Sequence, residues 1–277
     1  MGPASRDLLL VCLLTFVAFT PAFTSPIVCD LRTEDSCAIN GGIFAAVELQ
    51  PTGTGVINSF LRVQEKGTEQ GYNTSYRPVQ FDEKTDPNFT RDLSIAEVGI
   101  TTIGGLDYAT FYLDINEPSA REKEFLTLDQ LELFTTDETL RTGYTGTANT
   151  SSGDLPGTTK IYDLDFGADN YVQLSYNRFA GGSGQSDMAF YLPMSLFTGN
   201  YVNLFSQFGI IDNNPNKFGA DKPFGSEAGF EEWFSVESAS GGQPPPVITA
   251  VPEPATLALV GIGLLALTRH ARKRLDP

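Results

Sequence analysis

The chain has 277 residues, with 18 Lys and Arg against 34 Asp and Glu, and a formal net charge of −16 at pH 7. A body this acidic repels phosphate backbones and anionic lipids, which excludes nucleic acid as a partner. The single histidine is His270, near the C-terminus, so Ser-His-Asp catalysis, Cys-His catalysis and histidine-ligated zinc are excluded as well.

The first 24 residues predict a secretory signal peptide. Arg6 precedes an apolar run at residues 8–19, and small residues follow that run. A run of this length suits the apolar region of a signal peptide and is short for a membrane span. We therefore expect export, with an uncleaved N-terminal anchor as the alternative.

Two cysteines, Cys29 and Cys37, remain after that cleavage. An even pair in an exported chain predicts a disulfide bond, because the compartment is oxidising. A loop this short would stabilise the fold by about 2–3 kcal/mol and would fix the N-terminal segment.

Residues 25–238 are rich in strand-forming residues separated by Gly, Pro, Asn and Asp. The chain contains 20 Phe and 10 Tyr, which suit a half-buried pleated surface. In residues 171–179, Val172, Leu174 and Tyr176 alternate with polar residues, as in a strand with one buried face. The segments predicted as strands are 42–49, 56–64, 97–103, 108–115, 130–136, 159–166, 171–179, 188–197, 201–209 and 230–237.

These short strands predict an all-β fold, because no segment between them has apolar residues at helical spacing over more than two turns. We expect one antiparallel β-sandwich, jelly-roll-like, over residues 25–238. A split into two domains near residues 147–159 is the alternative. Residues 181–188 are rich in Gly and predict a hairpin connection, and residues 212–227 form a long polar loop whose role stays open.

One turn carries the only cofactor prediction. Asp163, Asp165 and Asp169 surround Gly167, and carboxylate oxygens on a turn are the ligands that Ca²⁺ takes. No Glu closes the loop as in an EF-hand. Ordinary turn aspartates are the alternative interpretation.

Carboxylate catalysis survives the absence of histidine, since a glycosidase needs only two acidic residues. So many acidic residues form pairs by chance that the pattern has no specificity. The single Trp233 also argues against an aromatic sugar cleft. We expect the protein not to be an enzyme.

The C-terminal region contains three segments of different composition. Residues 239–250 are rich in Pro and Gly and predict an extended spacer. Residues 255–268 are apolar and predict a helix of about 21 Å, shorter than the hydrocarbon core of about 30 Å. The cations that follow it, Arg269, Arg272, Lys273 and Arg274, favour a cytoplasmic C-terminus.

The order of these features resembles the PEP-CTERM sorting signal of Gram-negative bacteria. The matching residues are Val251, Pro252, Glu253 and Pro254, then the short apolar helix, then the basic cluster at residues 269–274. The resemblance implies processing by an exosortase, a membrane transpeptidase, and a link to exopolysaccharide or biofilm. It also implies transient anchoring in the inner membrane through the helix, before the protein reaches the cell surface, the outer membrane or the extracellular matrix.

The body is similar to uncharacterised ectodomains that carry the same tail, through residues 69–74, 111–118 and 182–188. That similarity names no activity. We therefore expect a structural or adhesive surface protein. A carbohydrate-binding module for matrix polysaccharide is the alternative, and an extracellular carboxylate-dependent hydrolase is a third.

Overall fold

The computed structural model of the chain describes residues 25–49, 59–120, 123–146, 152–179, 186–210, 224–227 and 229–236. The predicted signal peptide, the spacer, the apolar helix at 255–268 and the basic tail lie outside these ranges. Within them, no helix is long and apolar enough to cross a membrane.

One seven-stranded sheet, called sheet A here, has the order β1-β12-β10-β14-β6, with β11 paired to β10 and β7 paired to β14. Its pairs are antiparallel except β1 with β12, which is parallel. The strands are β1 (Val28–Asp30), β6 (Glu69–Tyr72), β7 (Leu93–Ser94), β10 (Phe125–Thr136), β11 (Thr159–Asp163), β12 (Tyr171–Ser175) and β14 (Tyr201–Phe208).

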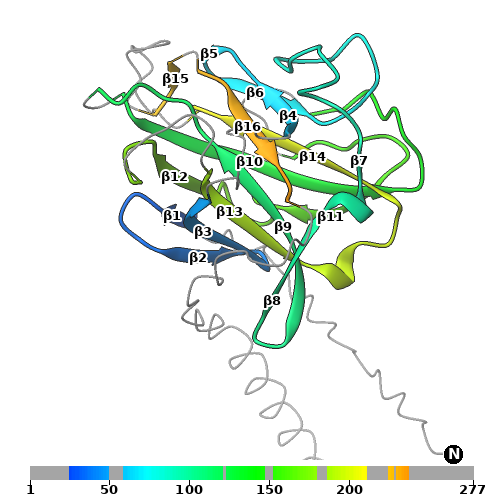
Figure 1. The fold of residues 1–277 in the computed structure, drawn as a ribbon, viewed down its shortest axis with the longest axis horizontal. Helices are drawn as coiled ribbons and strands as arrows, with labels where there is room; N and C mark the ends of the chain where they lie inside the picture. The colour runs from blue at the N-terminus through cyan, green and yellow to red at the C-terminus, as the bar shows by residue number, and fades with distance from the viewer. Residues whose placement is uncertain are drawn as a thin grey trace, which may run out of the picture.

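The other seven-stranded sheet, sheet B, has the order β2-β3-β13-β9-β16-β4, with β8 paired to β9 (Figure 1). All of its pairs are antiparallel. Its strands are β2 (Ser36–Ile39), β3 (Gly42–Leu49), β4 (Ser59–Val63), β8 (Gly99–Ile103), β9 (Leu106–Asp114), β13 (Ser186–Pro193) and β16 (Glu231–Phe234). A two-stranded sheet joins β5 (Lys66–Gly67) to β15 (Ser226–Glu227), and short 3₁₀ turns occupy Ile95–Glu97 and Met194–Leu196.

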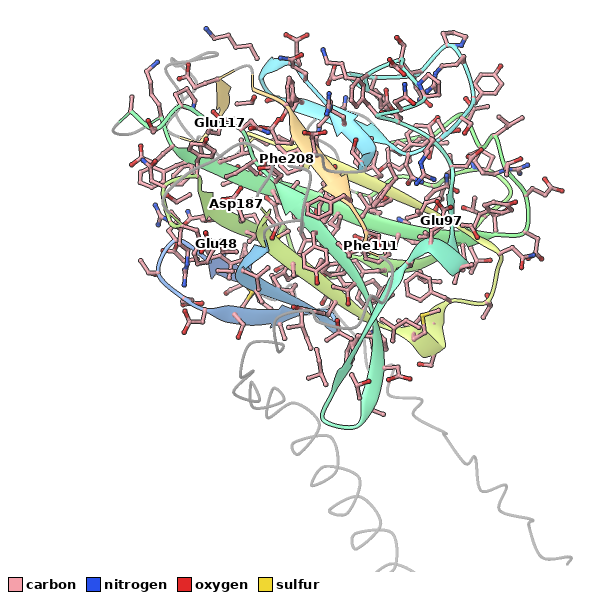
Figure 2. The ribbon with its side chains drawn as sticks, in the orientation of Figure 1. Glu48, Glu97, Phe111, Glu117, Asp187 and Phe208 are labelled. Atoms are coloured by element: carbon pink, nitrogen blue, oxygen red, sulfur yellow. A yellow bond between two sulfur atoms is a disulfide. The ribbon has the colours of Figure 1, made fainter. Side chains whose placement is uncertain are left out.

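Both large sheets contribute to one hydrophobic core. In β10, Leu131 and Leu133 are fully buried in it, and Phe111 of β9 joins them from sheet B. Trp233 of β16 donates its indole N–H to the hydroxyl of Ser206 in β14, at 3.0 Å, which ties sheet B to sheet A inside the core. Figure 2 labels Phe111 and Phe208, two members of this core. Each large apolar side chain buried in this way stabilises the fold by roughly 1.5–3 kcal/mol.

The all-β fold with antiparallel sheets is confirmed, and each of the ten predicted segments contains a strand. Strands from both sides of residues 147–159 pair with each other in each sheet, as β10 does with β11 and β9 with β13. The described strands therefore share one core. The jelly-roll strand order stays a prediction.

Candidate functional site

A disulfide bond joins Cys29 to Cys37, with the two Cα atoms 5.9 Å apart, as the sequence predicts. Cys29 lies in β1 and is fully buried, whereas Cys37 lies in β2. Since β1 belongs to sheet A and β2 to sheet B, the bond connects the first strands of the two sheets.

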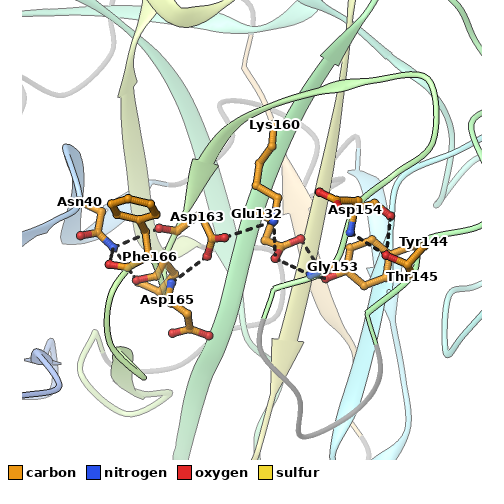
Figure 3. Close-up of polar contacts among 11 residues, drawn as sticks. Asn40, Glu132, Tyr144, Thr145, Gly153, Asp154, Lys160, Asp163, Asp165 and Phe166 are labelled. Carbon is orange, nitrogen blue, oxygen red and sulfur yellow. Dashed lines mark hydrogen bonds and ion pairs between the residues drawn. The ribbon is translucent and has the colours of Figure 1, made fainter. Parts of the chain in front are cut away.

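The three aspartates of the predicted calcium site lie at and after the end of β11. Figure 3 shows two of them, Asp163 and Asp165. Asp163 accepts the backbone N–H of Asp165 at 3.0 Å through one oxygen and contacts Lys160 at 3.2 Å through the other. Asp165 accepts the backbone N–H of Asn170 at 2.9 Å. These hydrogen bonds stabilise a tight turn on which Asp169 is exposed.

The acidic side chains of this turn lie close enough together to affect the pKa of Asp165. Burial, together with the nearby charges of Asp169 and Asp163, raises the pKa of Asp165 to about 8. Across the part of the chain that the structure describes, no three Asp, Glu, His or Cys side chains gather in an arrangement that could hold a metal ion. Calcium binding at Asp163, Asp165 and Asp169 stays a prediction.

A second polar group, which the sequence did not single out, lies beside that turn (Figure 3). Glu132 of β10 accepts the hydroxyl of Tyr144 at 2.9 Å and the backbone N–H of Gly153 at 2.9 Å. Lys160 bridges Glu132 and Asp163, at 3.2 Å from each. Burial raises the pKa of Glu132 to about 7, although Lys160 acts in the opposite direction. This network fixes the segment around Tyr144 and Gly153 over sheet A.

An open cavity of about 460 Å³ lies where β10 ends and β11 begins. Asp137 in its wall is oriented by Asn200, whose side-chain N–H₂ donates at 3.0 Å, and Arg141 is paired with Glu138. Its volume is within the range of small-molecule sites, but its wall is polar and contains no aromatic residue. The lining residues are Thr135, Thr136, Asp137, Glu138, Arg141, Gly157, Thr158, Thr159, Thr198 and Gly199.

Two segments that lie far apart in the sequence meet in the fold. Glu69 comes from residues 69–74 and Glu117 from residues 111–118, and each of them interacts electrostatically with Glu231 of β16. The sequence did contain a signal for this group. In residues 230–234, Glu231 shares the inward face of the strand with Trp233, where an apolar residue is expected.

The predicted sorting signal lies outside the described residues, including Val251, Pro252, Glu253, Pro254 and the basic cluster. The evidence for it comes from comparison of the sequence with known protein families. Residues 250–274 match the PEP-CTERM protein-sorting motif, which spans both the predicted triplet and the basic cluster. No curated protein and no solved structure gives a significant match to the chain.

Proposed function

We propose, on the premise that the chain carries a PEP-CTERM sorting motif and is an exported substrate of an exosortase, that its β-rich body is a structural or adhesive component of the cell surface or extracellular matrix. The motif at residues 250–274 is the observation that carries this proposal. In it, the body is a β-sandwich, and the spacer at 239–250 separates it from the membrane during sorting.

Three properties of the body support an extracellular role. It holds a disulfide bond between Cys29 and Cys37, which persists in oxidising compartments. It is strongly acidic, which keeps an exposed protein soluble. Its strands form two sheets around one core.

The apolar segment at 255–268 is the transient anchor in this proposal, with the basic cluster at 269–274 in the cytoplasm. It is about 9 Å shorter than a hydrocarbon core of about 30 Å, so it would hold the precursor only by thinning the bilayer or by snorkelling of the flanking cations. Removal of this segment by the exosortase then releases the body from the inner membrane, so that it can reach the cell surface or the extracellular matrix.

Replacing Pro252, Glu253 and Pro254 by Ala tests the sorting step. The precursor should remain in the membrane at its full mass, and the amount of protein in the extracellular matrix should fall. Intact-mass analysis of the surface form is the readout, and the wild-type surface form should lack residues 269–277. A wild-type surface form that retains Arg269 to Pro277 contradicts processing and leaves a simple anchored ectodomain.

Binding of matrix polysaccharide is the second candidate function, and the threonine-lined cavity favours it. Thr159 and Thr198 are exposed there beside Asp137 and Arg141, so hydroxyl, carboxylate and guanidinium groups face solvent together. Such groups pair with the hydroxyls of a neutral glycan. Binding of a soluble neutral glucan that Thr159→Val weakens and Thr85→Val leaves unchanged would support this function.

We propose no catalytic activity. Glu69 and Glu231, two carboxyl groups with strongly raised pKa values, are completely buried and cannot contact a polysaccharide substrate. A carboxylate-dependent hydrolase is therefore the least supported of the three functions. Turnover of a matrix glycan by the purified chain would restore it.

A further inference from the structure

Three glutamates from different parts of the fold meet at one end of the two sheets. Glu69 begins β6 in sheet A, and Glu231 begins β16 in sheet B. Glu117 follows β9, and the neighbouring Asn116 donates its side-chain N–H₂ to the carbonyl of Phe230 at 2.9 Å. This group therefore lies at a junction of both sheets.

These carboxyl groups are buried without enough donors. Glu69 and Glu231 are fully buried and Glu117 is 3 % exposed. Neither carboxyl oxygen of Glu231, nor Oε1 of Glu69, has a well-formed hydrogen bond from an N–H or O–H group of the protein. Among the described residues, no Lys or Arg forms an ion pair with any of the three. A buried carboxylate without a donor or a cation is so unfavourable that the group takes up a proton instead.

The surrounding groups add negative charge. Glu65 and Asp82 face Glu69, and Glu227 of β15 faces Glu117. Lys123 is a cation of this region, and it pairs with Glu227 at 3.3 Å. The backbone N–H of Glu65 donates to Glu69 at 2.9 Å, and that of Glu227 donates to Glu117 at 3.1 Å. These two donors satisfy part of the cluster and leave Glu231 dependent on its neighbours.

The pKa values agree with this geometry. Burial raises the pKa of Glu69 to about 7 and that of Glu117 to about 8. Burial, then the charge and contact of Glu69 and the charge of Glu117, raise the pKa of Glu231 well above its usual range. The backbone of Asn116 approaches Glu231 and acts weakly in the opposite direction. A protonated Glu231 can donate its O–H to the carboxyl group of Glu69, which joins sheet B to sheet A.

We propose that Glu69, Glu117 and Glu231 form a proton-sharing carboxyl latch that closes this end of the two sheets at acidic and neutral pH and opens it when the three groups ionise. Ionisation would place three negative charges between β6, β9 and β16, beside the carboxylates of Glu65, Asp82 and Glu227. Repulsion then separates β16 from β6 and releases the small sheet formed by β5 and β15. The protein thereby senses alkalinity at one end.

Glu231→Gln in the full chain tests the latch, because the amide keeps the shape and cannot ionise. One proton bound only by the folded state changes the unfolding equilibrium constant by about tenfold per pH unit. We expect wild type to lose stability as pH rises from the unfolded pKa values near 4 through the folded values of about 7 and 8, and the variant to lose about one proton of that dependence. Glu48→Gln is the matched control, because Glu48 is exposed on β3 and should keep the wild-type slope.

A second measurement keeps the proposal testable if the variant folds poorly. In wild type, amide hydrogen exchange corrected for intrinsic pH effects should accelerate in β15 and β16 above about pH 8, and not in β10. A pH slope in Glu231→Gln equal to that of wild type would overturn the latch, as would uniform exchange at both places. Stabilisation by millimolar Ca²⁺ at about pH 8.5, lost in Glu231→Gln, would overturn it too, because the cluster would then be a cation site.

Discussion

At the scale of single residues, Glu132 shows how one buried acid is kept compatible with the fold. It is 1 % exposed, and its neighbours are the hydroxyl of Tyr144, the backbone N–H of Gly153 and the ammonium group of Lys160. Tyr144 in turn stacks on Phe205, with ring centroids 4.1 Å apart. Removing the cation leaves a buried carboxyl group with only neutral donors.

Lys160→Met should lower the free energy of unfolding by roughly 1.5–3 kcal/mol at about pH 8, the range for a hydrogen bond to a charged group. The loss should be smaller at about pH 5, where Glu132 is protonated because its pKa is about 7. Chemical denaturation at the two pH values measures both. Lys66→Met, at an exposed position, is the control. Equal losses at both pH values would show that Lys160 does not act by stabilising the ionised carboxylate of Glu132.

At the scale of elements, the N-terminal strands are linked by the disulfide and by one unusual pairing. β1 has three residues and pairs in parallel with β12, with Cys29 opposite Val172. β2 pairs with β3 in the other sheet, with Cys37 opposite Phe44. Strands this short have few hydrogen bonds, so the covalent link contributes much of what keeps them in place.

Replacing Cys29 and Cys37 together by Ser should reduce the free energy of unfolding by about 2–3 kcal/mol, from the entropy that the closed loop removes from the unfolded chain. Hydrogen exchange in β1 should rise more than exchange in β10, because β10 is held by strands on both sides. Denaturant titration of the double variant is the measurement. Reduction of wild type should reproduce the loss, and an unchanged midpoint after reduction would argue against the link.

At the scale of the whole molecule, the buried acidic residues determine how the stability of the body depends on pH. Glu69, Glu117, Glu132 and Asp165 all have raised pKa values, of about 7 to 8, chiefly through burial. The folded state therefore binds more protons than the unfolded state between the unfolded values near pH 4 and the folded values near pH 7–8. Stability falls as pH rises through this interval and levels off above it.

We therefore expect the melting temperature to be highest near pH 5 and lower at pH 8. Asp30 works in the opposite direction at more acidic pH, because its hydrogen bond and ion pair with Arg32 lower its pKa. Its stabilisation is lost as pH falls below about 4, which places the optimum above that value. Thermal unfolding from about pH 3 to pH 9 measures the curve. A maximum at pH 8 would show that the buried acids are compensated by groups outside the described residues.

Much of the architecture could be predicted from the sequence because it depends on local patterns. Alternation such as Val172 and Leu174 predicted where strands form, and both residues are buried in the core. Six strands were missed because each has only two to four residues, too few for a pattern: β1, β2, β5, β6, β7 and β15. Except for β2, they pair with strands distant in sequence. In the segment predicted as a strand over 188–197, the strand ends at Pro193, where a 3₁₀ turn follows.

The sequence by itself determined what depends on neighbouring residues along the chain: the β-rich composition, the cysteine pair and the sorting motif at residues 250–274. Only the tertiary structure decided which acids meet. Glu69, Glu117 and Glu231 are separated by up to 162 positions in the sequence, so no spacing rule relates them. Strand pairing brings them together, and burial then changes their chemistry, because desolvation depends on what surrounds a carboxyl group in space.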